Sequence, residues 1–135
     1  MKIARAVWNE SWHTGDERLD RDHLAMFTML ESIRCWIEQD QPVPNDLMES
    51  FEACMVDHFR HEHELMKVTL CSTMPSHDRY HEQLLGAWAS LCSACEGHRD
   101  RGYPFSTFRE QFIYHQDEGG DRELVRHLRT AKRGS

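Results

Sequence analysis

The sequence has few of the residues that interrupt regular backbone structure, with seven Gly and four Pro among 135 residues. The prolines fall between stretches of regular apolar spacing, which favours a chain made mostly of helices. No stretch alternates apolar and polar residues over more than a few positions, so no β-strand is predicted. The sequence also contains no internal repeat and no low-complexity segment.

Long apolar runs and an excess of positive charge are absent as well. No apolar segment approaches the roughly 20 residues that a membrane-spanning helix needs, and the first residues do not form a signal peptide. Lys and Arg number 16 against 23 Asp and Glu, which gives a net charge of −7 and no support to nucleic-acid binding. We therefore expect a cytoplasmic protein with no nucleic-acid or membrane partner, and the oligomeric state stays open.

The cysteines are odd in number and irregularly spaced, so in a cytosolic chain we expect reduced thiols. They are Cys35, Cys54, Cys71, Cys92 and Cys95. Cys92-x-x-Cys95 is followed by Glu96 and not by the His of a heme attachment site. A redox pair is one interpretation of this motif. Two ordinary thiols on a helix is the interpretation that we favour.

Four stretches carry apolar residues at steps of three and four, the spacing of an amphipathic helix. The first begins near Arg18, after an irregular arm over residues 1–17, and ends before a loop at 39–44. The second begins with Asn45 as its N-cap, and a break at about 68–76 follows it. The third precedes a loop at 97–104, and the fourth follows that loop. We predict an all-α antiparallel up-down-up-down four-helix bundle, a single domain over residues 1–135.

Polar side chains interrupt the apolar stripe of every predicted helix. They are His23 in the first helix, His58 and Glu62 in the second, His77 and His81 in the third, and His115 in the fourth. Residues four apart on a helix point the same way, so each pair presents two polar groups to one place. Any one of these His alone is more often a hydrogen-bonded core residue. Burying all six without a common partner would cost several kcal/mol each, and a metal ion is the simplest such partner.

The remaining histidines are expected to be solvated, since they leave the stripes or lie near loops and ends. They are His13, His61, His63, His98 and His127. His61 is the one that could compete as a ligand, because it lies three residues after His58.

The composition of the predicted site favours two metal ions. Imidazoles with a few carboxylates suit iron, zinc, copper or nickel. With Asp121, the candidates outnumber the four ligands of one tetrahedral zinc, and two irons bridged by carboxylates fit them better. The His-Glu-x-x-His motif of zinc peptidases is absent. Glu10-x-x-His13 is a lone Glu-x-x-His in the arm, whereas ferritin-like di-iron enzymes need two on core helices.

These motifs resemble those of the bacterial hemerythrins, the non-heme di-iron oxygen-binding bundles. The matching pieces are Trp8-Asn9-Glu10 with Thr14-Gly15, Leu19-Asp20-x-x-His23, His58-Phe59-x-x-Glu62 followed by Leu65-Met66, and His77-x-x-x-His81. The resemblance implies two iron ions with an oxo or hydroxo bridge. It implies that His77, His81 and His115 serve one iron, that His23 and His58 serve the other, which keeps an open position, and that Glu62 and Asp121 bridge them.

The resemblance further implies reversible O2 binding, for storage, delivery or sensing, and no catalysis. A di-iron enzyme acting on peroxide or nitric oxide, or an oxygen-responsive signalling module, are the alternatives. One departure stands at the last motif, where the family places Asp five residues after the His and this chain has Gly120. Either a bulge at Gly119-Gly120 brings His115 and Asp121 inward together, or Gln116 takes the ligand position. We favour His115, which continues the apolar stripe, and Asp117 is the weaker substitute for Asp121.

Overall fold

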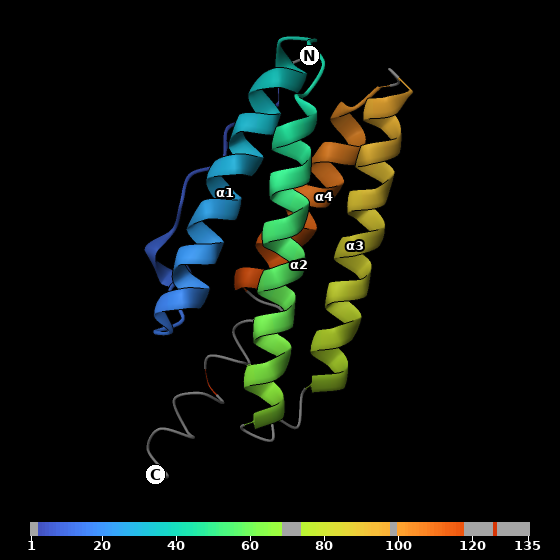
Figure 1. Ribbon diagram of the computed structural model, residues 1–135. Helices are drawn as coiled ribbons and strands as arrows, with labels where there is room; N and C mark the ends of the chain where they lie inside the picture. The colour runs from blue at the N-terminus through green and yellow to red at the C-terminus, as the bar shows by residue number, and fades with distance from the viewer. Residues whose placement is uncertain (1–2, 69–73, 98–99, 118–125, 127–135) are drawn as a thin grey trace.

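The computed structural model describes residues 3–68, 74–97, 100–117 and 126, with the side chains of residues 11, 74–76 and 115–117 outside that description. These residues form α1 (Glu17–Glu38), α2 (Asn45–Val68), α3 (Met74–Glu96) and α4 (Gly102–Asp117), with a short 3₁₀ helix, η1 (Glu10–Trp12), in the arm and no strand. Along the chain the helices run alternately up and down, and α1 also packs against α4 to close the ring (Figure 1). The predicted all-α four-helix bundle is confirmed.

The start of α1 is fixed by three residues of the arm and two of the helix. Asp16 is the N-cap, and its carboxylate accepts a hydrogen bond from the Leu19 amide at 2.9 Å. Asp20, one turn in, accepts from the Thr14 amide at 2.6 Å and from the Thr14 hydroxyl at 2.8 Å. Gly15 has φ +89°, a left-handed conformation that favours glycine. The turn into α1 therefore joins the arm to the helix that carries His23.

The end of α1 is set by a Schellman motif and not by the prolines of the following loop. The Asp40 amide donates to the Ile37 carbonyl and the Gln41 amide to the Trp36 carbonyl, both at 3.0 Å. Asp40 has φ +56°, the left-handed conformation that this motif requires. Since these bonds satisfy the last carbonyls, the helix stops at Glu38 before Pro42 is reached.

Three predicted helix starts are displaced in the structure. α3 begins at Met74 and α4 at Gly102, so Pro75 and Pro104 lie inside first turns and not in the preceding loops. Proline is tolerated there because the first amides of a helix have no intrahelical acceptor. Asn45 is not the N-cap, since the Pro44 carbonyl accepts from the Leu47 and Met48 amides at 3.1 and 3.2 Å.

The apolar stripes of the four helices meet in a core rich in aromatic rings. Phe51 of α2 lies 4.7 Å from Trp88 of α3 and 5.7 Å from Phe108 of α4, measured between ring centroids. Phe51 and Phe108 are fully buried. These rings lie in the half of the bundle near the 39–44 loop, and the polar residues of the stripes lie in the other half among apolar side chains such as Met26 and Phe59. None of the helices in the described ranges is long and apolar enough to cross a membrane.

Candidate metal centre

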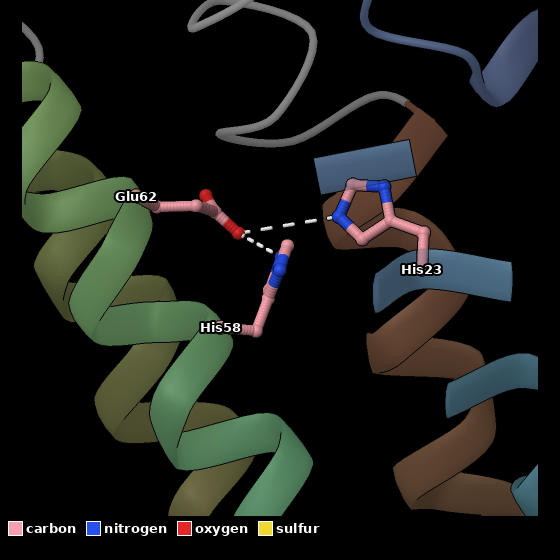
Figure 2. A group of neighbouring side chains, drawn as sticks. All are labelled: His23, His58 and Glu62. Atoms are coloured by element: carbon pink, nitrogen blue, oxygen red, sulfur yellow. Dashed lines mark ion pairs between the residues drawn. The ribbon is translucent and has the colours of Figure 1, made fainter. Parts of the chain in front are cut away.

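Glu62 lies at the centre of a cluster of buried histidines. Its side chain, on α2, is 0% exposed, and His58 lies one turn earlier on the same helix. His23 reaches it from α1, as Figure 2 shows, and His77 and His81 reach it from α3. All four histidines are buried. Three helices thus bring four imidazoles and one carboxylate together.

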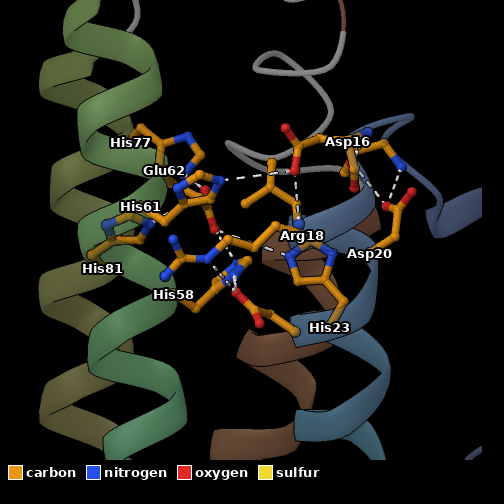
Figure 3. Close-up of polar contacts among 12 residues, drawn as sticks. Asp16, Arg18, Asp20, His23, His58, His61, Glu62, His77 and His81 are labelled. Carbon is orange, nitrogen blue, oxygen red and sulfur yellow. Dashed lines mark hydrogen bonds and ion pairs between the residues drawn. The ribbon is translucent and has the colours of Figure 1, made fainter.

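The two oxygens of Glu62 face different pairs of imidazoles. Oε1 contacts Nε2 of His58 and lies 4.0 Å from Nε2 of His23. Oε2 contacts Nε2 of His77 and lies 3.7 Å from Nε2 of His81 (Figure 3). Within each group of three residues, the atoms able to bind a metal lie within 4.8 Å of one another. The cluster therefore consists of two half-sites that share one carboxylate.

Helical spacing accounts for most of this geometry. His77 and His81 lie four residues apart on α3, with ring centroids 4.5 Å apart, and His58 and Glu62 have the same spacing on α2. His23 and His58 come from different helices, with ring centroids 4.4 Å apart, so the packing of α1 against α2 brings them together. The structure brings together the five residues that the stripes of α1 to α3 predicted.

The electrostatics of the cluster favour an ionised carboxylate. Burial raises the pKa of Glu62, but the contacts with His58, His77 and His81 outweigh that effect and leave the pKa well below its usual value. A buried carboxylate surrounded by imidazoles favours the binding of a cation between the carboxylate and the rings.

Asp22 is a site residue that the sequence analysis missed. Its Oδ2 lies 3.3 Å from Nδ1 of His58, on the side of the ring away from Glu62. This contact is the main cause of the lowered pKa of Asp22. Metal-binding histidines generally donate their second nitrogen to such an acceptor. That rule could have drawn attention to an acid beside His23, but only the packing of α1 on α2 shows that it serves His58.

Phe59 supports the other half-site. Its ring stacks on that of His81, with centroids 3.9 Å apart and planes 10° from parallel. The motif His58-Phe59-x-x-Glu62 thus supplies two polar groups and a flat apolar support from one turn of α2.

His13, His61 and His63, the other histidines whose side chains are described, belong to neither half-site. His61 was predicted to be solvated, but its Nε2 is buried, 3.8 Å from the Asp16 carboxylate. His63 lies near the surface with its Nδ1 3.2 Å from Asp78, and His13 pairs with Glu10 at 2.9 Å. His98 and His127 lie outside the described residues.

The predicted C-terminal metal ligands, His115 and Asp121, fall outside the side chains that the structure describes. The backbone of His115, Gln116 and Asp117 belongs to α4, and their side chains are outside the description. Gly119, Gly120 and Asp121 are outside it entirely. The choice between His115 and Gln116, and the role of Asp121, therefore stay predictions.

The two cysteines of the C-x-x-C motif are free thiols near the opposite end of α3. Burial, with smaller effects of Glu52, Cys95 and Glu96, raises the pKa of Cys92 to about 11, and burial also raises that of Cys95. A raised pKa makes a thiol a poor nucleophile at neutral pH, which favours the interpretation as ordinary thiols.

The donor set fits a pair of transition metals. Imidazole nitrogens and a carboxylate are ligands that iron accepts, and no thiol belongs to either described half-site. A carboxylate that offers one oxygen to each half-site is the arrangement needed to bridge two ions. The class of protein defined by this fold and cluster is a helical bundle with a buried His/Glu group able to bind metal.

One relative agrees with that class. Myohemerythrin from Theromyzon tessulatum is 26% identical over 78 residues, which are 58% of this chain and 61% of that protein. The chain thus matches about three fifths of the length of this relative. No family model matches the chain, and no solved structure matches it. The relative, the bundle and the cluster together support a hemerythrin-like protein.

Proposed function

We propose that the protein binds dioxygen reversibly at a pair of iron ions, for oxygen storage, delivery or sensing. The observation that carries this proposal is the division of the Glu62 carboxylate between two imidazole pairs. The similarity to myohemerythrin and the motifs shared with the bacterial hemerythrins support it.

In this proposal each residue of the cluster has one task. His23 and His58 would hold one iron, His77 and His81 would hold the other, and the Glu62 carboxylate would be shared between them. His115 would complete the second set, and Asp121 would supply a further carboxylate. Once bound, the iron pair would supply reversible dioxygen binding, with electrons drawn from the metals.

The surroundings of His23 and His58 favour a carrier over a catalyst. Met26 follows His23 by three residues, Met55 precedes His58 by three, and both are fully buried. Phe27 and Phe59 add buried rings on the same two helices. Apolar side chains at these positions would keep water away and carry no proton donor, whereas peroxide or nitric oxide reduction requires protons. A dry pocket protects a bound molecule from side reactions and lets it leave unchanged.

Anaerobic iron loading followed by an optical spectrum tests the proposal. We expect about two irons per chain, a visible band that appears with oxygen, and loss of that band when oxygen is removed under argon. Iron-loaded, reduced protein without an oxygen-dependent band would contradict the proposal. Many turnovers with peroxide or nitric oxide, faster than free iron, would instead support the enzymatic alternative.

A further inference from the structure

A chain of polar contacts runs from His58 to the protein surface. Oδ2 of Asp22 lies 3.3 Å from Nδ1 of His58 and 4.0 Å from Nε of Arg18. Nη2 of Arg18 lies 2.9 Å from Oδ2 of Asp57, on α2. Exposure rises outward along this chain, from 1% for the His58 side chain to 17% for Asp22 and 44% for Arg18.

Each ring nitrogen of His58 faces a carboxylate, Asp22 at Nδ1 and Glu62 at Nε2. A neutral imidazole has one N–H donor and one acceptor nitrogen. With a metal ion between Nε2 and Glu62, the Asp22 carboxylate would stabilise the N–H at Nδ1 and leave the Nε2 lone pair to the metal. Because Nε2 is the atom that faces Glu62, the same contact prepares His58 to bind a metal in the half-site.

We propose that Asp22 is a positioning residue for His58, and that Arg18 holds Asp22 in place by pairing with Asp57 across α1 and α2. This inference rests on the proposed metal-binding function. Asp22 does not touch the metal in this proposal; it fixes the tautomer and orientation of a ligand. Its loss should therefore weaken the half-site of His23 and His58 and spare the half-site of His77 and His81.

The chain contains a matched control for this contact. Nδ1 of His63 lies 3.2 Å from Oδ1 of Asp78, almost the same distance as in the His58–Asp22 pair. Both side chains are 40% exposed, and neither belongs to a half-site. Asp78→Ala thus removes a similar contact without touching the cluster.

The first experiment measures Fe²⁺ binding to the full chain under anaerobic conditions, by competition with a chelator. We expect Asp22→Ala to weaken one of two binding steps about 10–100-fold, the usual effect of losing such a partner. Asp22→Glu should recover part of the loss. Arg18→Gln should weaken the same step about 2–5-fold, because it breaks an exposed pair, and Asp78→Ala should leave both steps unchanged.

The second experiment reads the position of the His58 proton directly. NMR of Zn²⁺-loaded, ¹⁵N-histidine-labelled protein should show a slowly exchanging N–H at Nδ1 of His58, with faster exchange in Asp22→Ala. Equal weakening of both iron steps, or equal behaviour of the Asp22→Ala and Asp78→Ala variants, would overturn the inference. Normal iron binding without an oxygen-dependent band would overturn the proposed function alone.

Discussion

The imidazole of His81 lies flat on the ring of Phe59, so α2 supports a candidate ligand of α3 from the side. A stacked pair of this kind contributes about 1 kcal/mol beyond its packing. Phe59→Leu should therefore lower the free energy of unfolding by about 1 kcal/mol or more in urea denaturation, and weaken metal binding at the half-site of His77 and His81. Phe108→Leu, far along the core, is the control. A loss of metal affinity no larger than in that control would mean that the stack does not orient His81.

Glu62→Gln keeps the shape of the side chain and removes its charge. Since one carboxylate faces both half-sites, we expect the variant to hold less than one iron per chain, against about two in the unchanged protein. Metal analysis after anaerobic loading and desalting measures this. Glu64→Gln changes an exposed acid two residues away and should retain full iron content. Two tightly bound irons in Glu62→Gln would refute the bridging role.

His115 and Gln116 compete for the C-terminal ligand position. We expect His115→Ala to lose iron or the oxygen-dependent band, because an imidazole is the better ligand and His115 continues the stripe of Phe112. Gln116→Ala should keep both. The reverse result would assign the position to Gln116.

Asp20 joins the arm to α1 through its bonds to Thr14 and to the Gly15 amide. Hydrogen bonds to a charged group are worth about 1.5–3 kcal/mol each, but partial exposure of the Asp20 side chain, 17%, reduces their sum. Asp20→Ala should lower the free energy of unfolding by about 2 kcal/mol in urea denaturation. Glu17→Ala, in the same turn and exposed, should cost well under 1 kcal/mol, the effect of a charge near a helix start. Similar losses of unfolding free energy in the two variants would mean that the Asp20 hydrogen bonds do not stabilise the join between the arm and α1.

The thiol of Cys92 should react slowly at neutral pH. With a pKa of about 11, only about one thiol in a thousand is ionised at pH 8, and this fraction rises about tenfold per pH unit up to pH 10. Alkylation by iodoacetamide, followed residue by residue with mass spectrometry, should show that slope. Cys35, which is exposed, is the internal comparison. Equal rates for the two thiols at pH 8 would contradict the buried, un-ionised state of Cys92.

The periodicity of the apolar residues was sufficient to predict the four helices. It also predicted that each pair of polar residues lies on the core-facing side of its helix. His58 with Glu62 and His77 with His81 follow from a spacing of four, whatever the packing. The starts of α3 and α4 were missed because Pro75 and Pro104 resemble breaks in sequence, while a first turn needs no amide at those positions. The end of α1 depends on hydrogen bonds from the backbone amides of Asp40 and Gln41, which nearly any residue pair could donate.

Contacts between helices could not be predicted in the same way. No spacing within α1 shows that Asp22 serves His58, or that His23 shares an oxygen of Glu62 with it. Those relations depend on how α1 lies along α2, to within a fraction of a helical turn.

Because the cluster depends on how α1 lies along α2, the carboxylate of Glu62 reports whether the helices have packed in the correct register. A slip of α1 by four residues along α2, about one turn, would keep its apolar stripe facing the core but move His23 about 6 Å along α2, away from Glu62. An apolar core of similar side chains could tolerate such a slip, but a metal with fixed bond lengths could not. If ions bind as proposed, their uptake selects the correct register among nearly equivalent packings. Iron content would then measure the fraction of chains whose helices have docked correctly.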